Sequence, residues 1–152
     1  MRKATPEDLM FLFNLKNEKV VLQWSFDQNP VDLETHKKWF AKKISDPLTA
    51  LYIVENDGQA IGQVRFDVGP DNSAVISIDI SSAYRGKGYG TEAIKESLDV
   101  LFQSHPEVKT VNSFIFLANT ASQRAFTKAG FGRAVVLPDH PDRVQMAYER
   151  SS

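Results

Sequence analysis

Hydrophobic positions follow two different periods along this chain. Near the N-terminus, apolar residues such as Leu9, Leu12 and Leu15 form one broad side of a helix, after a start signal at Thr5-Pro6-Glu7. Alternation over 74–80 and the apolar run over 110–117 are typical of strands. These periods predict helices over about 6–17, 33–44, 93–102 and 120–129, and strands over 2–4, 51–55, 60–68, 74–80, 110–117, 132–137 and 143–149. The aromatic-rich stretch 18–30 shows neither period and is predicted to be irregular.

The order of these elements indicates the fold class. A hairpin signal at 56–59 and a turn signal at 69–72 join three strands into an antiparallel meander. One strand–helix–strand crossover follows, and two antiparallel strands close the chain. The prediction is an α/β (α+β) mixed sheet of about seven strands, mostly antiparallel with a central parallel pair, and four helices. Residues 1–152 show no repeat, low-complexity tract or linker, so one domain is expected.

The charge balance and the missing cysteines narrow the possible partners. The chain has 18 basic and 19 acidic residues and a net charge of −1 at pH 7, so no global field favours nucleic acid or an anionic membrane. No apolar run approaches the roughly 20 residues that span a bilayer, and the first residues carry charges where a signal peptide is apolar. The absence of cysteine removes thiolate metal sites and fits a reducing compartment. We expect a cytoplasmic protein with no nucleic-acid, membrane or metal partner.

The stretch YRGKGYGTEA, residues 84–93, carries the clearest candidate chemistry. Its three glycines lie between a strand and a helix, where the free backbone N–H groups of the helix start form an anion site. Arg85 and Lys87 add two cations, and Thr91 adds a hydroxyl in the first turn. This combination predicts a pyrophosphate site. The alternative is a turn that serves chain geometry alone, in which the cations and the threonine would be incidental.

Two common phosphate-binding motifs do not fit this loop. A Walker A loop requires Ser or Thr after Gly-Lys, whereas Gly88 follows Lys87. Gly88, Gly90 and Ala93 match a relaxed dinucleotide fingerprint, but the acidic residue that it requires about 20 positions on is missing from TVNSFIFLAN. A dinucleotide-binding fold also needs more parallel strands than this chain supplies. ATP, GTP and dinucleotides are therefore disfavoured.

Two segments resemble a known family. ISIDISSAYRGKGYGTEAI is similar to the acetyl-CoA motif of the GNAT (Gcn5-related) N-acetyltransferases, in which Arg/Gln-x-x-Gly-x-Gly/Ala joins a strand to a helix. Arg85, Gly88 and Gly90 occupy its defining positions. NTASQRAFTKAGF resembles the family's Asn-…-Ser/Ala-…-aromatic-…-Gly-Phe helix. Both motifs stand in the family's order and spacing, and the resemblance in strand order covers nearly the whole chain.

The resemblance implies direct transfer of an acetyl group from acetyl-CoA to an amine, without a metal or a covalent enzyme intermediate. In this family the pyrophosphate binds the glycine loop, and the pantetheine arm lies along the preceding strand, whose amide stabilises the oxyanion. The helix that begins at Asn119 forms the opposite lip. These roles imply the cofactor residues Ile78, Ile80, Arg85, Gly86, Lys87, Gly88, Tyr89, Gly90, Thr91, Asn119, Ser122 and Phe126.

The motifs leave proton transfer open. An attacking amine must be neutral, so a base must accept its proton, directly or through water. Asp79 and His36 are the candidates, and Glu18 is a weaker third; Asp79 could instead face solvent or pair with an arginine, and His36 could be a packed helix histidine. Many family members have a tyrosine acid where this chain has Phe126, which cannot donate. Water or another side chain is expected to protonate the leaving thiolate.

A weaker resemblance indicates the acceptor. NLKNEKVVLQWSF, THKKWF and GQVRFD resemble, in order, segments of bacterial N-acetyltransferases that act on nucleotide-linked amino sugars. An aromatic, hydroxyl-bearing wall suits a sugar, although these aromatic residues could also belong to the core. The predicted acceptor residues are Trp24, Ser25, Phe26, His36, Trp39 and Arg65.

Other acceptors and one other class of function stay open. The enzyme alternatives are a peptide N-terminus or ribosomal-protein acetyltransferase and a polyamine acetyltransferase. A polyamine is disfavoured, because residues 33–44 contain four lysines and one glutamate. The remaining alternative is a non-catalytic CoA-binding module on the same scaffold. We expect a monomer or homodimer that binds a small-molecule amine.

Overall fold

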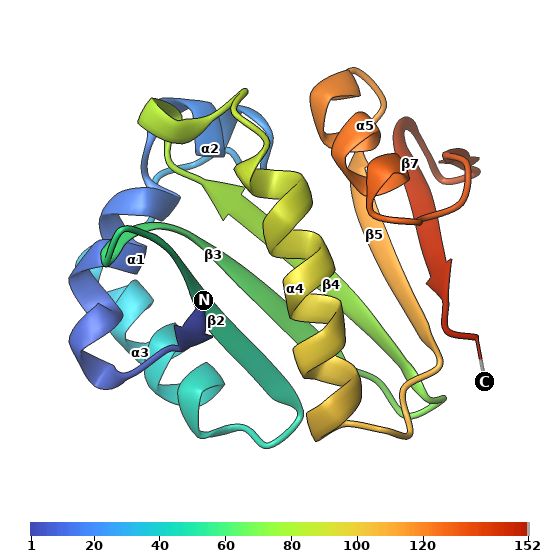
Figure 1. The fold of residues 1–152 in the computed structure, drawn as a ribbon. Helices are drawn as coiled ribbons and strands as arrows, with labels where there is room; N and C mark the ends of the chain where they lie inside the picture. The colour runs from blue at the N-terminus through green and yellow to red at the C-terminus, as the bar shows by residue number, and fades with distance from the viewer. Residues whose placement is uncertain (152) are drawn as a thin grey trace.

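The computed structural model describes residues 1–151 and contains one seven-stranded sheet (Figure 1). The strands lie in the order β1-β2-β3-β4-β5-β7-β6, and β4 and β5 are the parallel pair. The strands are β1 (Arg2–Lys3), β2 (Thr49–Asn56), β3 (Gln59–Val68), β4 (Ser73–Ile80), β5 (Thr110–Phe116), β6 (Val135–Leu137) and β7 (His140–Glu149). The helices are α1 (Leu9–Lys16), α2 (Lys19–Gln23), α3 (Leu33–Ser45), α4 (Tyr89–Ser104) and α5 (Thr120–Lys128), and short 3₁₀ turns occupy Pro6–Asp8 and Ser82–Tyr84.

This architecture confirms the predicted fold class and corrects the number of helices. The described residues form five α-helices rather than four, because α2 lies in the stretch that was predicted to be irregular. This helix is five residues long and has no side-chain cap, so it carries little helical signal of its own. The start of the first helix also differs, since it opens as a 3₁₀ turn. The Asp8 carboxylate holds that turn by accepting from Thr5 N at 2.7 Å and from the Arg2 guanidinium at 2.7 and 2.8 Å.

Helices cover both faces of the sheet. On one face α4 packs against β2, β3 and β4; α1 and α3 contact strands of the sheet from the other side. The alternation of β2 shows the two layers, because Tyr52 and Val54 join the core under α4 whereas Leu51 and Ile53 join the core with α1 and α3. β2 is therefore buried on both faces, which is why its sequence is a continuous apolar run.

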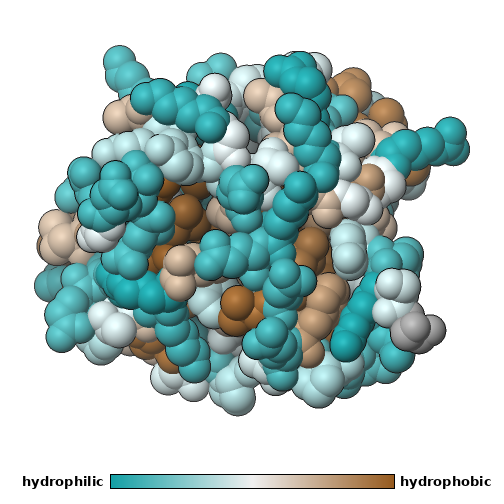
Figure 2. Space-filling view, viewed as in Figure 1, coloured by the Kyte–Doolittle hydropathy of each residue, from teal (hydrophilic) through white to brown (hydrophobic). Residues whose placement is uncertain are grey.

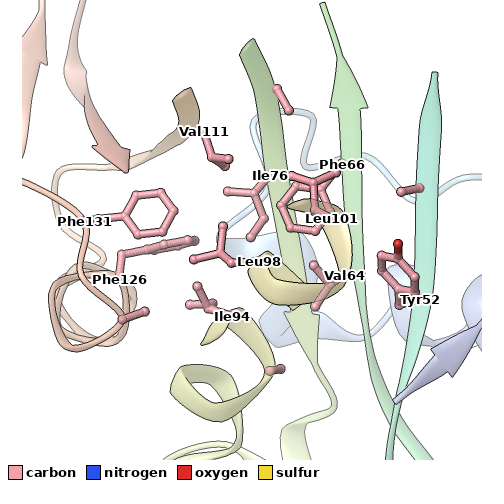
Figure 3. Close-up of a cluster of buried hydrophobic side chains, with 14 of the residues drawn as sticks. Tyr52, Val64, Phe66, Ile76, Ile94, Leu98, Leu101, Val111, Phe126 and Phe131 are labelled. Atoms are coloured by element: carbon pink, nitrogen blue, oxygen red, sulfur yellow. The ribbon is translucent and has the colours of Figure 1, made fainter. Parts of the chain in front are cut away.

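The larger core lies between α4, α5 and the sheet (Figure 3). Leu98 and Leu101 of α4 lie near Ile76 of β4, and Phe126 and Phe131 extend the cluster toward α5. The rings of Phe126 and Phe131 meet edge to face, with their centroids 4.9 Å apart. This packing fixes the axis of α4, and with it the position of the N-terminus that follows the glycine loop.

β4 and β5 pair along only part of their length. Residues 73–76 of β4 pair with 110–113 of β5, whereas β4 stays paired with β3 as far as Ile80. Figure 1 shows the two strands diverging toward the end of the sheet where α5 and the start of α4 lie. Residues 77–80 of β4 therefore have an unpaired edge that faces β5.

Hydrophilic side chains dominate the face of the molecule that Figure 2 shows. Hydrophobic residues are visible there in recesses between the charged side chains. Within residues 1–151, no helix combines the length and the apolar character that crossing a membrane requires.

Candidate active site

The glycine loop forms the entry to α4. Gly88 is the N-cap of this helix with a φ of +87°, and Gly86 has a φ of +74°, both in the left-handed region that side chains disfavour. A Cβ added at Gly86, Gly88 or Gly90 would meet no atom within 4 Å. The three glycines therefore leave an open backbone cradle in front of the first N–H groups of α4. Such a cradle is the geometry that a phosphate requires.

Two predicted cofactor residues lie beside this cradle rather than in it. Lys87 and Tyr89 do not line the cavity that the glycines border. The Lys87 ammonium lies 6.0 Å from the centre of the Tyr84 ring, and the Tyr84 and Tyr89 rings meet edge to face at 5.9 Å. Tyr89 therefore packs the loop, and Lys87 acts at most through its charge.

The unpaired edge of β4 presents backbone donors to the gap beside β5. Ser81 N donates to Ile61 O of β3 at 2.8 Å. Because successive N–H groups of a strand point to opposite sides, the N–H groups of Ile78 and Ile80 point away from β3 and toward this gap. These are the groups to which the family resemblance assigns the pantetheine and oxyanion contacts.

The opposite side of the gap is formed by α5. Asn119 caps this helix, and its Oδ1 accepts from Ser122 N at 3.2 Å. The Asn119 Nδ2 has no hydrogen-bond partner among residues 1–151, so it is the atom of this side chain that is free for a ligand. Phe126 is 1% exposed, and its ring belongs to the main core and also borders the cavity. Because the residue is a phenylalanine, no hydroxyl group points from this ring into the cavity.

One cavity of about 590 Å³ joins the cradle, the gap and the space under α1 and α3. It brings together residues that lie far apart in the sequence, and these include both predicted cofactor residues and predicted acceptor residues. The predicted cofactor residues that line it are Ile78, Ile80, Arg85, Gly86, Gly88, Gly90, Thr91, Asn119, Ser122 and Phe126. All predicted acceptor residues line it as well, namely Trp24, Ser25, Phe26, His36, Trp39 and Arg65.

Two cations lie at the acceptor end of the cavity, against Trp39. The Lys16 ammonium is 4.5 Å from the Trp39 ring centre, and the Arg65 guanidinium is 5.3 Å from it. Arg65 also pairs with Asp67 at 2.9 Å, whereas Lys16 has no carboxylate partner in the described part of the chain. Burial, and next the positive charge of Arg65, lower the pKa of Lys16. Lys16 was missed by the sequence analysis, because an isolated lysine at the end of a helix gives no signal.

Asp79 lies in the cavity beside a glutamine that the sequence analysis also missed. Gln63 Nε2 donates to Asp79 Oδ2 at 2.8 Å, whereas the buried Gln63 Oε1 has no hydrogen-bond partner. Burial raises the pKa of Asp79; the hydrogen bond from Gln63 and the charges of Arg65, Lys16 and Arg85 act in the opposite direction. Gln63 and Arg65 alternate along β3, with Gln63 opposite Asp79 and Arg65 opposite Ser77 in register, and this pattern could have revealed the pair.

The other two base candidates are held by the fold. His36 is 1% exposed, its Nε2 donates to Leu9 O at 3.2 Å, and its ring stacks on Trp39 with centroids 5.6 Å apart. Burial lowers the pKa of His36 and keeps the ring neutral. The Glu18 carboxylate accepts from Ser81 Oγ and Ser82 N, both at 2.8 Å, and does not line the cavity. Glu18 therefore ties the region of α2 to the glycine loop and is misplaced for a base.

Within residues 1–151, no group of three or more His, Cys, Asp or Glu side chains is close enough to hold a metal ion. Backbone N–H groups and the guanidinium and ammonium groups of Arg and Lys side chains are the donors on the cavity wall, and the Asp79 carboxylate is its one acidic acceptor among the same residues 1–151. This set suits an anionic organic ligand.

Comparisons with known proteins identify the family of the chain. A model of the acetyltransferase (GNAT) domain family matches residues 1–132. YwnH of Bacillus subtilis (strain 168), provisionally named a phosphinothricin acetyltransferase, is 26% identical over 145 residues, which cover 91% of this chain and 86% of that protein.

Solved structures share the fold at lower identity. Spermidine N-acetyltransferase from Vibrio cholerae, solved with CoA and spermine, superposes with a TM-score of 0.85 at 20% identity over 97% of this chain and 93% of its own. AAC(6')-Ib in complex with ribostamycin and coenzyme A superposes with a TM-score of 0.82 at 23% identity, over 98% and 92% of the two chains.

The family match covers every residue that lines the cavity. It includes the glycine loop, the unpaired edge of β4 and the cap of α5. The chain therefore belongs to the GNAT acetyltransferase family and is an acetyl-CoA-dependent N-acetyltransferase.

Proposed function

We propose that the acceptor is a small molecule with a primary amine, and specifically an amino sugar linked to a nucleotide. The observation that carries the proposal is the acceptor end of the cavity, where Lys16 and Arg65 lie against Trp39. Trp24 and Phe26, whose rings pack against Phe116, add aromatic surface to the lining of the same cavity. A half-buried lysine without a carboxylate partner is unfavourable unless an anion joins it. The phosphates of a nucleotide would supply that anion, and the aromatic rings would stack on the sugar or the base.

The cofactor half of the site would bind and activate the acetyl donor. The cradle at Gly86, Gly88 and Gly90 accommodates a pyrophosphate that a Cβ would obstruct, and Arg85 lines the same end. When bound, acetyl-CoA supplies an acetyl thioester, which is the activated acyl group. The N–H groups on the free edge of β4, near Ile80, would stabilise negative charge on the carbonyl oxygen. Water would protonate the leaving thiolate, since Phe126 carries no hydroxyl.

A second candidate acceptor is supported by the relative at 26% identity. Phosphinothricin is an amino acid with a phosphinate group, and its two acidic groups would also complement Lys16 and Arg65. The same two cations disfavour spermidine and spermine, although a spermidine acetyltransferase shares the fold. A peptide N-terminus carries no obligatory anion and makes no use of the two cations.

The proposal is tested by measuring the release of free CoA thiol from acetyl-CoA with a panel of amines. The panel contains UDP-glucosamine, free glucosamine, phosphinothricin, spermidine and an alanyl peptide. We expect UDP-glucosamine to give a higher kcat/KM than free glucosamine, because both carry the same amine but only UDP-glucosamine carries phosphates. Preference for the peptide or for spermidine would overturn the proposal. Binding of CoA without thiol release with any of these amines would also overturn the proposal, because the acceptor would then lie outside every class in the panel.

A further inference from the structure

A row of polar side chains lies on the face of the sheet opposite the main core. In register, Gln63 of β3 is the partner of Asp79 of β4, and Arg65 is the partner of Ser77. These side chains share one face because partners across an antiparallel pair point to the same side. All four line the cavity, whereas Ile78 and Ile80 alternate to the other face. The polar row is thus built into the sheet and does not depend on a mobile loop.

Gln63 has a hydrogen-bonding capacity that the protein does not use. The residue is 7% exposed, and its Nε2 donates to Asp79 Oδ2 at 2.8 Å. Its Oε1 is buried and has no partner in the described part of the chain. Buried polar atoms are nearly always satisfied, so one left open in a cavity marks a place for a ligand. Because this oxygen can only accept, the ligand must donate an N–H or O–H group.

The neighbouring carboxylate narrows the choice of donor. Gln63 Oε1 accepts hydrogen bonds, and the Asp79 carboxylate beside it is negatively charged. Together they select a group that has several N–H donors and a positive charge, as an ammonium group has. The unpaired edge of β4, where the thioester carbonyl would be polarised, lies on the same strand as Asp79. An amine at this point would therefore be held next to the carbon that it attacks.

We propose that Gln63 and Asp79 form the amine subsite, in which Gln63 Oε1 accepts an N–H bond from the acceptor amine and Asp79 takes its proton. The inference rests on the proposed function, because it assigns the amine end of the same acceptor. Asp79 is the catalytic base, and Gln63 contacts the amine while its Nε2 orients the carboxylate.

The acetyl transfer needs only the amine, acetyl-CoA, Asp79 and water. The amine enters as its ammonium form and gives one proton to the Asp79 carboxylate, which frees the nitrogen lone pair. The nitrogen bonds to the acetyl carbonyl carbon, the carbon–sulfur bond breaks, and the nitrogen gives its second proton to water, while Asp79 passes the first proton on to solvent. The thiolate takes one proton from water. The products are an amide, the CoA thiol and one proton released to solvent, and no oxidant or reductant is needed.

Charged groups from several elements face Asp79. Lys16 of α1, Arg65 of β3 and Arg85 of the loop favour the ionised carboxylate, and the hydrogen bond from Gln63 does the same. Burial has the larger effect and raises the pKa of Asp79, while His36 of α3, which lines the same cavity, is kept neutral. A base whose pKa is raised toward neutral pH accepts a proton more readily than an ordinary aspartate. The rate should therefore rise with pH as Asp79 ionises.

The first test compares Asp79→Asn with Asp71→Asn, which removes an exposed carboxylate from the turn before β4. With the best acceptor of the panel, Asp79→Asn should lower kcat/KM at pH 7 by roughly 100-fold or more. The deficit should shrink as the pH approaches the pKa of the amine, which then needs no base. Asp71→Asn should match the wild-type protein, and all three should bind CoA equally. An unchanged pH profile for Asp79→Asn would overturn the inference.

The second test needs no turnover and separates this inference from the proposed function. The Asp79 carboxyl carbon is titrated by NMR in the CoA-bound protein, alone, with methylammonium and with tetramethylammonium at the same high concentration. Methylammonium should lower the Asp79 titration midpoint, and tetramethylammonium, which has no N–H group, should not. Replacing Gln63 in Gln63→Leu should weaken the methylammonium effect. If the two cations act alike, the amine subsite is wrong even where the panel identifies an acceptor; if no acceptor is found, this titration still decides the subsite.

Discussion

A Gly90→Ala substitution tests the role of the glycine loop, because it should raise the stability of the free protein and weaken the binding of acetyl-CoA. Gly90 is in the first turn of α4 without a positive φ, and a Cβ there would meet no atom within 4 Å. In Gly90→Ala, the reduced backbone freedom of the unfolded chain should therefore stabilise the free protein by roughly 0.5–1 kcal/mol. For a chain of 152 residues this corresponds to a rise in Tm of about 1–4 °C. Gly88→Ala should do the reverse, since its φ of +87° costs alanine roughly 1–2 kcal/mol.

Binding should change in the other direction at Gly90. The methyl group would stand in the cradle and displace the phosphate from a backbone N–H, and one charge-assisted hydrogen bond contributes roughly 1.5–3 kcal/mol. The affinity for acetyl-CoA should fall about 10- to 150-fold. At a ligand concentration about 100 times the wild-type Kd, the ligand stabilises the wild-type protein by about 2.7 kcal/mol, and a 100-fold weaker site by about 0.4 kcal/mol. The rise in Tm on adding acetyl-CoA should thus drop from about 5–11 °C to about 1 °C.

The assay is thermal denaturation with and without acetyl-CoA, supported by calorimetric titration. Lys87→Ala is the matched control, because Lys87 belongs to the loop but lies outside the cavity, and its loss should weaken binding less than Gly90→Ala does. A Gly90→Ala protein that is more stable and binds acetyl-CoA as tightly as the wild type would refute the cradle. The loop would then be a structural turn.

Three further predictions concern the core, the acceptor end and the N-terminal turn. Phe126→Ala should lower the unfolding free energy by about 3–5 kcal/mol in urea denaturation, because the ring is 1% exposed. Phe126→Tyr should fold and bind acetyl-CoA. If Phe126→Tyr unfolds the protein, the ring has no opening to the cavity. Lys16→Met should raise KM for a phosphate-bearing acceptor about tenfold, equivalent to ~1.4 kcal/mol, and leave acetyl-CoA affinity unchanged; an equal rise for an uncharged amine would contradict an anion site. Asp8→Asn should lower the unfolding free energy by about 1.5–3 kcal/mol at neutral pH, because the carboxylate accepts two bonds from Arg2. The pKa of Asp8 is lowered by that hydrogen bonding, so this stability is present above the ordinary aspartate pKa and is lost as pH falls through the folded value; a gap that persists in acid denaturation would count against it.

The glycine loop and the cap of α5 could be predicted because their geometry is local. Glycines at left-handed positions, a helix start and a capping Asn119 are encoded within a few neighbouring residues, so YRGKGYGTEA and NTASQRAF specify their own conformation. Thr91 lies in the first turn of α4 as expected, although Tyr89-Gly90 is a poor helical sequence and packing further along the helix must support this start.

The acceptor half was harder to predict because its residues meet only through tertiary structure. Lys16 ends α1, Gln63 lies inside β3, and neither belongs to a motif. A lone glutamine in an alternating strand normally faces solvent, and only the covering helices turn that face into a cavity wall. His36 shows the opposite case: it lies on the predicted stripe, but stacking on Trp39 and its bond to Leu9 O make it a packed residue.

The separation of β4 from β5 gives this sheet an edge in its interior. Edge strands normally lie at the rim, where another chain can add to them, and proteins protect them with charges or bulges. Here the free edge at 77–80 lines the cavity together with residues of α4 and α5, so a chain that pairs with it must lie inside that cavity. The amides of Ile78 and Ile80 should consequently exchange with deuterium faster than their neighbours in the empty protein and slow sharply when CoA is bound. The cofactor would act as a missing strand, and the hydrogen bonding of the sheet would be complete only while the cofactor is bound.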